Sequence, residues 1–568
     1  MIERNKFRRG CAVAGALFTL LGCTGAPDHS ASPATSGGST QGGTTSSTST
    51  GGVPAEGGAS SVTSSGGAGT GGSEVGGSTT LGATGGSATG GAGTGGSGVG
   101  GSTKLGATGG SATGGAGTGG SSACVAPALR NPTSAQIALS GFTSVSYGGY
   151  LNGESFQEDG ILSYKGYQYT AFWNTNRQVV MARRKLSPSA TDADGAWEKF
   201  DFTDYTNTEA DAHNTISLGV SPADGALHLS FDHHSSTLHY RKSKVDLMND
   251  PGSATWAAAS FTAVSNALVA GTAVAEVTYP RFITEPGGAK MLFSARLGTS
   301  GSGDEHLWEY TASAGTWAYI GKYLDGISAS VNAYPHGLSY TRAGSRLHIS
   351  WCWRATPDAT TNFDLYYMYS DDNGRTWKNN GGTAVATTGT TSVTLSSSSN
   401  VRVWTINQNR GLINQEHMAV DSAGRVHVLL SHMPDSQADD SNFTSARTKA
   451  QYFHYMRDTN GTWVRHVIAN TPVMLNFRGK FAISSSNTVY AVLPIPAPSN
   501  AAQSALRILA ASTCDNYAQW AVLATNTDRA YFSDPLIDTA RLASENELTI
   551  YYPQQTSVNI WGLEYTLN

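Results

Sequence analysis

Histidines gather in one short stretch of this sequence of 568 residues. The segment from Asp211 to Arg241, "DAHNTISLGVSPADGALHLSFDHHSSTLHYR", contains five of the 14 histidines: His213, His228, His233, His234 and His239. Because the imidazole pKa lies close to physiological pH, a histidine can take up or release a proton during catalysis. The segment is therefore the first candidate for a proton-transfer site.

The doubled histidine at 233–234 ends a predicted strand. Alternate residues of a strand share a face, which would place His228, Asp232 and His234 on one side and His233 on the other. One of the pair is therefore expected to face a polar site while the other packs, and the residues do not decide which. The alternative is that these histidines are ordinary strand residues with satisfied hydrogen bonds.

Later segments supply tyrosine and arginine. "VTYPRF" contains Tyr279, "LFSARLGTSGSG" contains Arg296, and "AYPHGLSY" and "LHISWCWR" contain His336 and Arg354. A guanidinium can bind a carboxylate through two parallel hydrogen bonds, and a phenol can transfer a proton. With histidine, these groups suffice for β-elimination from a uronate, in which the carboxylate is neutralised, C5 loses a proton and the oxygen on C4 leaves. Singly, each could equally be a strand-edge charge or a packed aromatic.

Composition excludes several other classes of function. Charged residues make up 14% of the chain and the net charge is −5, so neither sign dominates and no nucleic-acid partner is expected. The sequence has no P-loop, H-E-x-x-H or C-x-x-C motif, and no G-x-S-x-G in a strand-to-helix setting. A site must therefore be assembled from several segments.

The first 123 residues are expected to export and tether the protein. Residues 1–22 combine a basic start with a short apolar run, and Leu20-Leu21-Gly22-Cys23 resembles a bacterial lipobox. We predict a lipid on Cys23 and a place in the cell envelope, at the outer membrane or cell surface; an ordinary secretory signal is the alternative. Residues 23–123, rich in Gly, Ser and Thr, are predicted to be a disordered linker, so only the lipid would touch the membrane.

Residues 124–568 read as an all-β domain. Short alternating strands separated by turn residues recur in about seven units, which predicts a seven-bladed β-propeller; a large β-sandwich or β-helix is the alternative. The units start near Gly160, His213, Tyr279, His336, His417, Lys480 and Asp534. "SDDNGRTW" matches the Asp box, a structural turn of propellers. Because a propeller brings its ends together, we expect a Cys124–Cys514 disulfide, and the domain is expected to be a monomer.

The order of these motifs resembles BNR-type seven-bladed propellers that act as polysaccharide lyases, namely ulvan lyases and rhamnosyl-α-1,4-glucuronate lyases. The resemblance rests on the histidine-rich segment, "YPRF", "RLGTSGSG" and "LHISWCWR". It implies an acidic polysaccharide cut between a rhamnosyl residue and O4 of a glucuronate. It further implies Tyr279 as acid, a histidine or Tyr279 as base, and Arg296 and Arg354 as carboxylate ligands. The implied catalytic residues are His213, His234, Tyr279 and Arg296, and the implied substrate contacts are Asn214, His233, His336 and Arg354.

Other functions remain open at this point. A related propeller branch hydrolyses the same linkage, and a non-catalytic carbohydrate-binding propeller would also suit the tether. A sialidase would need more Asp boxes than the one present. The lyase chemistry requires no cofactor, although a structural calcium or zinc ion fits the family. His336, His348 and Cys352 are suitable zinc ligands by type, but His348 and Cys352 would lie roughly 13 Å apart on an extended strand.

Overall fold

The computed structural model describes residues 124–568, apart from 142–151, 153–158, 190–191, 210, 343, 532–533, 555–556 and 568. The predicted signal peptide (1–22) and linker (23–123) lie outside the described residues. The described part is built from β-strands with two short α-helices, α1 (Phe443–Thr448) and α2 (Thr539–Glu545). Within this part, no helix has the length and apolarity that a membrane crossing requires.

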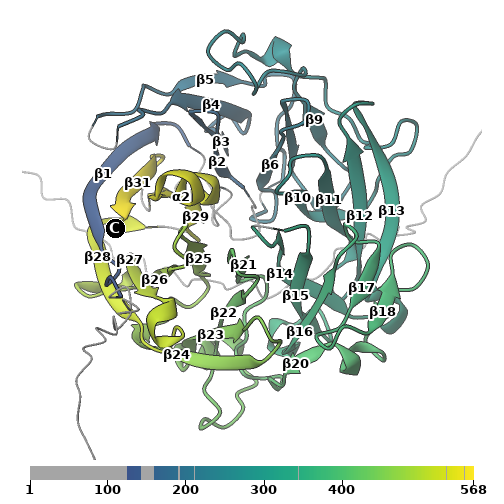
Figure 1. Ribbon diagram of the computed structural model, residues 1–568, viewed down its shortest axis with the longest axis vertical. Coiled ribbons are helices and arrows are strands. Elements are labelled where there is room, and N and C mark those ends of the chain that lie inside the picture. Colours follow the sequence, from purple (N-terminus) through teal and green to yellow (C-terminus); the bar gives the residue numbers. More distant parts are fainter. Residues whose placement is uncertain are drawn as a thin grey trace, which may run out of the picture. The chain divides into compact units, whose positions relative to one another are not determined.

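In the described part of the chain, the strands form seven blades around a central axis (Figure 1). Blade 1 consists of β2 (Ile161–Tyr164), β3 (Tyr167–Trp173), β4 (Val179–Lys185) and β5 (Glu198–Asp201). Blade 2 consists of β6 (Ile216–Ser221), β7 (Ala226–Phe231) and β9 (Tyr240–Lys242). Blade 3 consists of β10 (Val277–Thr284), β11 (Met291–Thr299), β12 (Ser302–Thr311) and β13 (Thr316–Asp325), with β8 (His234–Ser236) beside β10.

Blades 4 to 7 follow the same plan. Blade 4 consists of β14 (Asn332–Tyr340), β15 (Leu347–Arg354), β16 (Asn362–Ser370), β17 (Thr376–Lys378) and β18 (Ala384–Thr387), with the short β19 (Val393–Thr394) and β20 (Arg402–Trp404) nearby. Blade 5 consists of β21 (His417–Val420), β22 (Val426–His432), β23 (Gln451–Arg457) and β24 (Trp463–Pro472). Blade 6 consists of β25 (Lys480–Ile483), β26 (Val489–Ala497), β27 (Asn500–Ala511) and β28 (Ala521–Tyr531). Blade 7 consists of β29 (Leu536–Ile537), β30 (Glu547–Pro553), β31 (Ile560–Leu567) and β1 (Leu129–Ala138). The predicted all-β propeller is confirmed.

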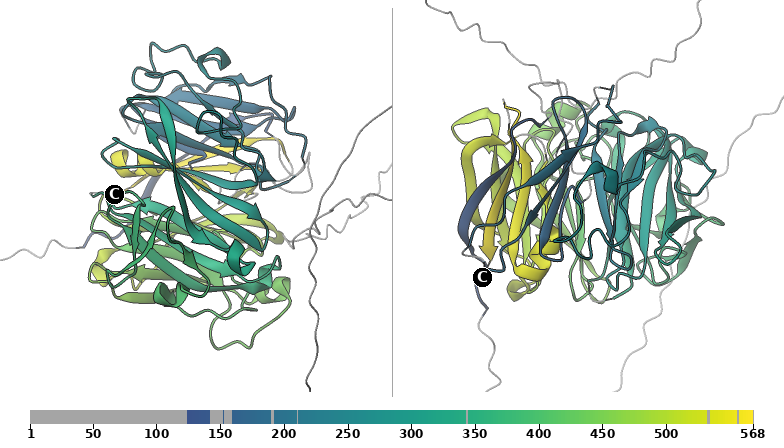
Figure 2. Two further views of the ribbon diagram at one scale, coloured as in Figure 1. Left: turned by 90° about the vertical axis from the view of Figure 1, so that its right-hand side faces the viewer. Right: turned by 90° about the horizontal axis from the view of Figure 1, so that it is seen from above.

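The two ends of the domain close the ring. β1, the first strand in the sequence, pairs antiparallel with β31, the last, so that it forms the outer strand of blade 7 (Figures 1 and 2). Just before β1, Cys124 forms a disulfide with Cys514, and their Cα atoms lie 5.9 Å apart. Cys514 belongs to the 3-10 turn between β27 and β28, so the disulfide attaches the N-terminal strand to blade 6.

Removing this disulfide should destabilise the domain. The bridge joins residues 390 positions apart, and disulfides that close long loops contribute about 2–5 kcal/mol to the free energy of unfolding. We expect the Cys124→Ser/Cys514→Ser double variant to unfold at a lower temperature than the parent in circular dichroism. Parent protein treated with a reductant serves as the control and should match the variant. Equal midpoints for the oxidised parent and the variant would contradict the prediction.

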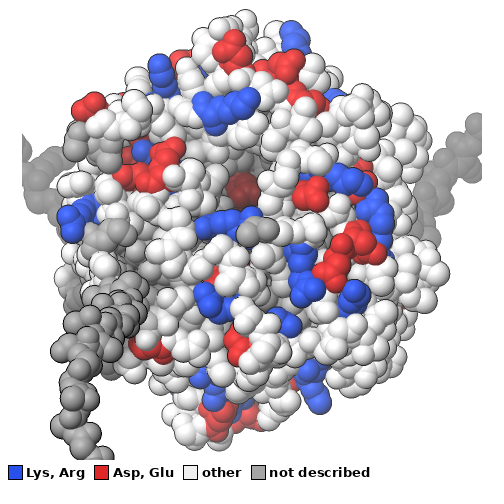
Figure 3. Space-filling view, viewed as in Figure 1, with Lys and Arg blue, Asp and Glu red and all other residues white. Residues whose placement is uncertain are grey.

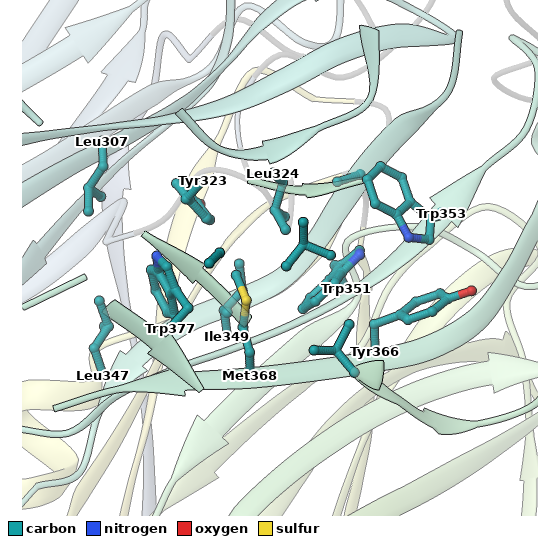
Figure 4. Close-up of a cluster of buried hydrophobic side chains, with 14 of the residues drawn as sticks. Leu307, Tyr323, Leu324, Leu347, Ile349, Trp351, Trp353, Tyr366, Met368 and Trp377 are labelled. Atoms are coloured by element: carbon teal, nitrogen blue, oxygen red, sulfur yellow. The ribbon is translucent and has the colours of Figure 1, made fainter. Parts of the chain in front are cut away.

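Large aromatic side chains fill the space between neighbouring blades. One such cluster lies between blades 3 and 4 and includes Trp351, Trp353 and Trp377, all fully buried against Leu307 and Tyr323 (Figure 4). Alternate residues of each strand point to one face of the sheet, which explains why the apolar residues of β15 and β16 meet those of β12 and β13. Trp377 ends the Asp box, which closes the turn between β16 and β17 and so has a structural role.

The direction of the strands decides which loops can build a site. The innermost strand of every blade runs the same way along the axis, so segments that precede inner strands meet at one end of the ring. Segments that follow inner strands, such as α2 after β29, lie at the other end. His213 precedes β6 and Tyr279 lies at the start of β10, which places both at the first end.

Candidate active site

A carboxylate joins the two histidines that lie at the entrance to blade 2. Asp211 accepts a hydrogen bond from Nδ1 of His213 at 2.5 Å, and its other oxygen accepts one from Nδ1 of His234. The two imidazole rings stack with their centroids 3.9 Å apart and an interplanar angle of 17°. Since an ionised carboxylate only accepts, both hydrogens are assigned to Nδ1, and the basic nitrogen of each ring is Nε2.

Asp211, His213 and His234 are together called the clamp. Strand pairing brings Tyr279 and Arg296 next to it. Thr278 of β10 pairs with His234 of β8 on one side and with Arg296 of β11 on the other. The ring centroid of Tyr279 lies 5.8 Å from that of His213, and the Arg296 guanidinium lies 5.0 Å from the Tyr279 ring. Arg296 is held by a 2.8 Å hydrogen bond from its Nη2 to the Thr278 hydroxyl. The segment before β6 and the three paired strands β8, β10 and β11 therefore meet at one point.

Blade 4 contains a second tyrosine–arginine pair. Tyr334 is the third residue of its inner strand, as Tyr279 is in blade 3, and each is followed by proline. The Arg354 guanidinium lies 4.4 Å from the Tyr334 ring and donates to its hydroxyl at 3.3 Å. The two tyrosine rings meet edge to face with their centroids 6.0 Å apart. The residue analysis missed Tyr334; the Tyr-Pro repeat at the same strand position in successive blades is the signal that could have found it.

The environment sets different protonation states in the site. Burial raises the pKa of Tyr279 well above its usual value, so its phenol stays protonated. Burial also acts on Tyr334, but the nearby guanidiniums of Arg354 and Arg296 outweigh it and lower the Tyr334 pKa. Burial, aided by the neighbouring His234, lowers the pKa of His213 to about 4. At neutral pH the site therefore combines a neutral imidazole with a protonated phenol.

Backbone strain surrounds these residues. Asp232, Ser235, Glu276 and Tyr279 have φ values of 66°, 52°, 56° and 59°, in the left-handed region that L-residues rarely adopt. Each such residue costs about 1–2 kcal/mol, and strain of this kind concentrates at functional sites. Asp232 and Ser235 flank the doubled histidine. The turn at Asp232 also ends the alternation of β7, so the predicted shared face of His228, Asp232 and His234 is wrong.

The structure separates the two adjacent histidines. His233 is fully buried, its Nε2 accepts a 2.8 Å hydrogen bond from the backbone N–H of His239, and burial lowers its pKa well below the usual value. His233 therefore lies in the interior, and its substrate contact stays a prediction. His234 is the one that lies beside His213. His228 belongs to the core, where Nδ1 contacts the Tyr240 hydroxyl at 2.6 Å.

Three further residues are predicted to contact the substrate, namely Asn214, His336 and Arg354. Asn214, next to His213, is almost fully buried, and its backbone carbonyl accepts a hydrogen bond from the Trp173 indole. His336 is 1% exposed, its Nδ1 accepts from the backbone N–H of Glu416 at 3.3 Å, and burial lowers its pKa to about 3. The substrate contact of His336 stays a prediction. Substrate contacts of Asn214 and Arg354 stay predictions.

One group of side chains has the composition of a metal site. Among the described residues, one group has ligand atoms within 4.8 Å of one another, namely Asp211, His213 and His234. The hydrogen bonds between these residues already use both Nδ1 atoms, so a cation would have to displace them. His348 instead contacts the hydroxyls of Thr341 and Tyr367, and Cys352 packs in the core beside Tyr334. The suggested zinc ligands His336, His348 and Cys352 form no such group in the part of the chain that the structure describes.

Comparison with known proteins reveals a family and several distant relatives. The model of a family described as "BNR repeat-containing family member" matches residues 167–471. Two curated relatives, each described as "Ulvan lyase, long isoform", come from Alteromonas sp. and Pseudoalteromonas sp. (strain PLSV). They are 26% and 25% identical over 268 residues, which cover 39% of this chain and 26% of each relative. The match thus spans about a quarter of the length of those relatives.

Solved structures share the fold at lower identity. The polysaccharide lyase Uly1 superposes with a TM-score of 0.57 at 15% identity, covering 77% of this chain and 99% of that one. A PL25 ulvan lyase bound to -[GlcA(1-4)Rha3S]- superposes with a TM-score of 0.54 at 13% identity, covering 75% and 94%. At these identities the likeness establishes the propeller architecture.

Proposed function

Because the chain belongs to the BNR repeat-containing family, we propose that it is a polysaccharide lyase that cleaves rhamnosyl-(1→4)-glucuronate linkages by β-elimination. The proposed substrate is an acidic glycan of the ulvan or plant-gum type. The observation that carries the proposal is the placement of two stacked histidines next to Tyr279 and Arg296. The similarity to curated ulvan lyases, and the uronate oligosaccharide bound to one structural neighbour, support the same class.

In the proposed mechanism each group has one task. Arg296, with Arg354, binds the glucuronate carboxylate and stabilises the negative charge that develops when C5 loses its proton. Nε2 of His213 or His234 accepts that proton, since Asp211 keeps the hydrogen of each ring on Nδ1. Tyr279 donates its phenolic proton to O4 as the O4–C4 bond breaks. The oxygen departs with the rhamnosyl residue, and a C4–C5 double bond remains on the uronate.

The carboxylates near the site favour elimination over hydrolysis. Glycosidases of the usual kind place two carboxyl groups on either side of the scissile bond, about 5–9.5 Å apart. Both oxygens of Asp211, the carboxylate that touches the two histidines, are bound to them, so Asp211 is not free to act as a glycosidase acid or nucleophile. Glu305 and Glu416 are almost fully buried, and burial raises the pKa of each to about 7. We therefore rank hydrolysis of the same linkage second.

The most direct assay follows the ultraviolet absorbance of the unsaturated uronate. The full-length protein is incubated with ulvan and, separately, with a gum whose glucuronate residues carry rhamnose at O4. A rise in absorbance with either polymer supports the proposal and identifies the polymer class. Free rhamnose without a rise in absorbance would instead support hydrolysis.

The pH dependence should reveal the depressed imidazole. If His213 is the base, kcat/KM should stay level from neutral pH down to about pH 5 and fall as the imidazole takes up a proton near its pKa of about 4. Initial rates in buffers of constant ionic strength measure this profile. An acid limb near about 6.5, the unperturbed imidazole value, would exclude His213 as the base.

Replacing Asp211 by asparagine should disrupt the clamp. An amide accepts from one imidazole but donates to the other, so one ring must change tautomer and carry its hydrogen on Nε2. We expect kcat to fall by roughly 10²–10⁴-fold, in the range for a misplaced general base. Asp204→Asn, an exposed carboxylate bound to Arg241, is the matched control. Equal losses in both variants would contradict the role of Asp211.

We also propose that the enzyme acts at the cell envelope, with Cys23 as its lipid-modified anchor. The lipobox-like sequence before Cys23 supports this location. Metabolic labelling with a fatty acid, in the parent and in Cys23→Ala, tests it.

A further inference from the structure

A second cleft lies between blades 7 and 1, and we propose that it binds a neutral sugar residue of a polysaccharide. Its volume is about 580 Å³, and its walls come from β1, from β4 and the segment that follows it, and from β30 and β31 with α2. The residues used below are Arg184, Trp197, Arg541, Glu547 and Glu564.

This cleft is at the opposite end of the ring from the candidate active site. Arg541 follows the inner strand β29 and Arg184 lies near the end of β4, whereas His213 precedes its inner strand β6. Figure 1 shows α2 beside β31 and β29 at this end. In the same view, Figure 3 shows acidic and basic atoms close together over that region. One glycan residue therefore cannot occupy both sites.

The wall of the cleft is a network of paired charges. Arg541 Nη1 donates to Glu564 Oε1 at 2.7 Å, and Arg184 Nη2 donates to the same oxygen. Both guanidiniums also lie 3.2 Å from Oδ2 of Asp194. Two positive and two negative groups balance within this network, and the other charged residues of the wall, Asp192, Lys199 and Glu547, also carry both signs. A ligand of high charge would meet repulsion from one of the two sets, so the network favours a neutral ligand.

Several polar atoms of these buried side chains have no partner among the described residues. They are Nη1 of Arg184, Oε2 of Glu564 and Oε2 of Glu547. Arg184, Glu564 and Glu547 are 4%, 8% and 8% exposed as whole residues, and all three line the cleft. The set offers one donor nitrogen and two acceptor oxygens to a ligand in the cleft.

A sugar satisfies this set best. Each hydroxyl group can donate to a carboxylate oxygen and accept from a guanidinium, which matches the unpaired atoms. Trp197, held by the Arg184 guanidinium 4.9 Å from its ring, adds an aromatic wall suited to the C–H face of a pyranose. A uronate would place its carboxylate near Glu547 and Glu564, and a metal cation would face two arginines.

The inference rests on the proposed function in one respect: the proposed substrate is a polymer that contains neutral sugars. A site on the opposite face would keep such a polymer attached after each cleavage and would raise the effective concentration of the remaining chain. Binding and catalysis can be measured separately, so failure of one is distinguishable from failure of the other.

The test is calorimetric titration of the full-length protein with methyl α-L-rhamnoside, and with sodium glucuronate for comparison. We expect the rhamnoside to bind saturably and the glucuronate at least tenfold more weakly. Trp197→Ala and Glu547→Gln should each weaken rhamnoside binding tenfold or more. Burial raises the pKa of Glu547, so loss of its charge should not cost stability. Asp435→Asn, an exposed carboxylate after β22 that pairs with Arg465 and is not part of the cleft wall, is the control and should bind like the parent.

Arg296→Gln alters the candidate active site and not this cleft. We therefore expect its affinity for the rhamnoside to stay within twofold of the parent value. Equal binding by Trp197→Ala, Glu547→Gln and the parent would overturn the proposal, as would the absence of saturable binding in the parent. Equal or tighter binding of glucuronate would overturn the neutral-sugar assignment.

Discussion

Tyr279→Phe is expected to lower kcat by about 10²–10⁴-fold and to leave KM within a few-fold of the parent value, because it removes a general acid and little else. The phenol lies next to His213, and burial raises its pKa, so that it carries the proton that the leaving oxygen needs. Initial rates on the responsive polymer, followed by ultraviolet absorbance, measure the change.

Tyr340→Phe is the matched control for this variant. Tyr340 is also a buried tyrosine, and it lies at the far end of β14, where its hydroxyl donates to Asn373 at 3.2 Å. We expect a small loss of stability and unchanged kcat in the control. If Tyr279→Phe kept kcat within a few-fold of the parent, Tyr279 could not be the acid.

Arg296→Gln should reduce kcat/KM by at least about 10²-fold, the size of effect that follows the loss of one group that stabilises developing negative charge. The guanidinium lies over the Tyr279 ring and is held by Thr278, so it can neutralise a carboxylate beside the proton acceptor. The loss should shrink on a methyl-esterified uronate substrate, since an ester needs no neutralisation to acidify C5. That dependence on the substrate separates a charge role from a structural one.

Arg241→Gln controls for the removal of a buried arginine. Arg241 is 2% exposed, pairs with Asp204 and lies in blade 2 over the Phe202 ring, away from the catalytic group. Its loss should lower stability and leave the ratio of rates on free and esterified substrate unchanged. The same ratio in Arg296→Gln and the parent would contradict carboxylate neutralisation by Arg296.

The fold was predictable from sequence because each blade repeats one local pattern. Alternating apolar residues and turn residues indicate a strand without knowledge of its partners, and the seven predicted unit starts fall within a few residues of the inner strands. His336 shows the limit of this reading, since β14 begins at Asn332, four residues earlier.

The candidate site was predictable in its residue types but not in its arrangement. The structure brings together His213, His234, Tyr279 and Arg296, which the motifs had singled out. It also reveals that His233 packs inside, because the left-handed residues at 232 and 235 end the strand alternation on which the sequence argument relied. Asp211 was missed because a bridge between two histidines depends on how a loop folds back, which no local pattern encodes.

The masses of the products distinguish elimination from hydrolysis most directly. We would cleave an oligosaccharide of the polymer that gives a rise in ultraviolet absorbance. The masses of this substrate and of its products would then be measured by mass spectrometry. We expect fragments with an unsaturated uronate at the non-reducing end, whose masses add up to the mass of the substrate. Fragments whose summed mass exceeds the mass of the substrate by one water molecule for each bond cleaved would contradict elimination and would identify a hydrolase.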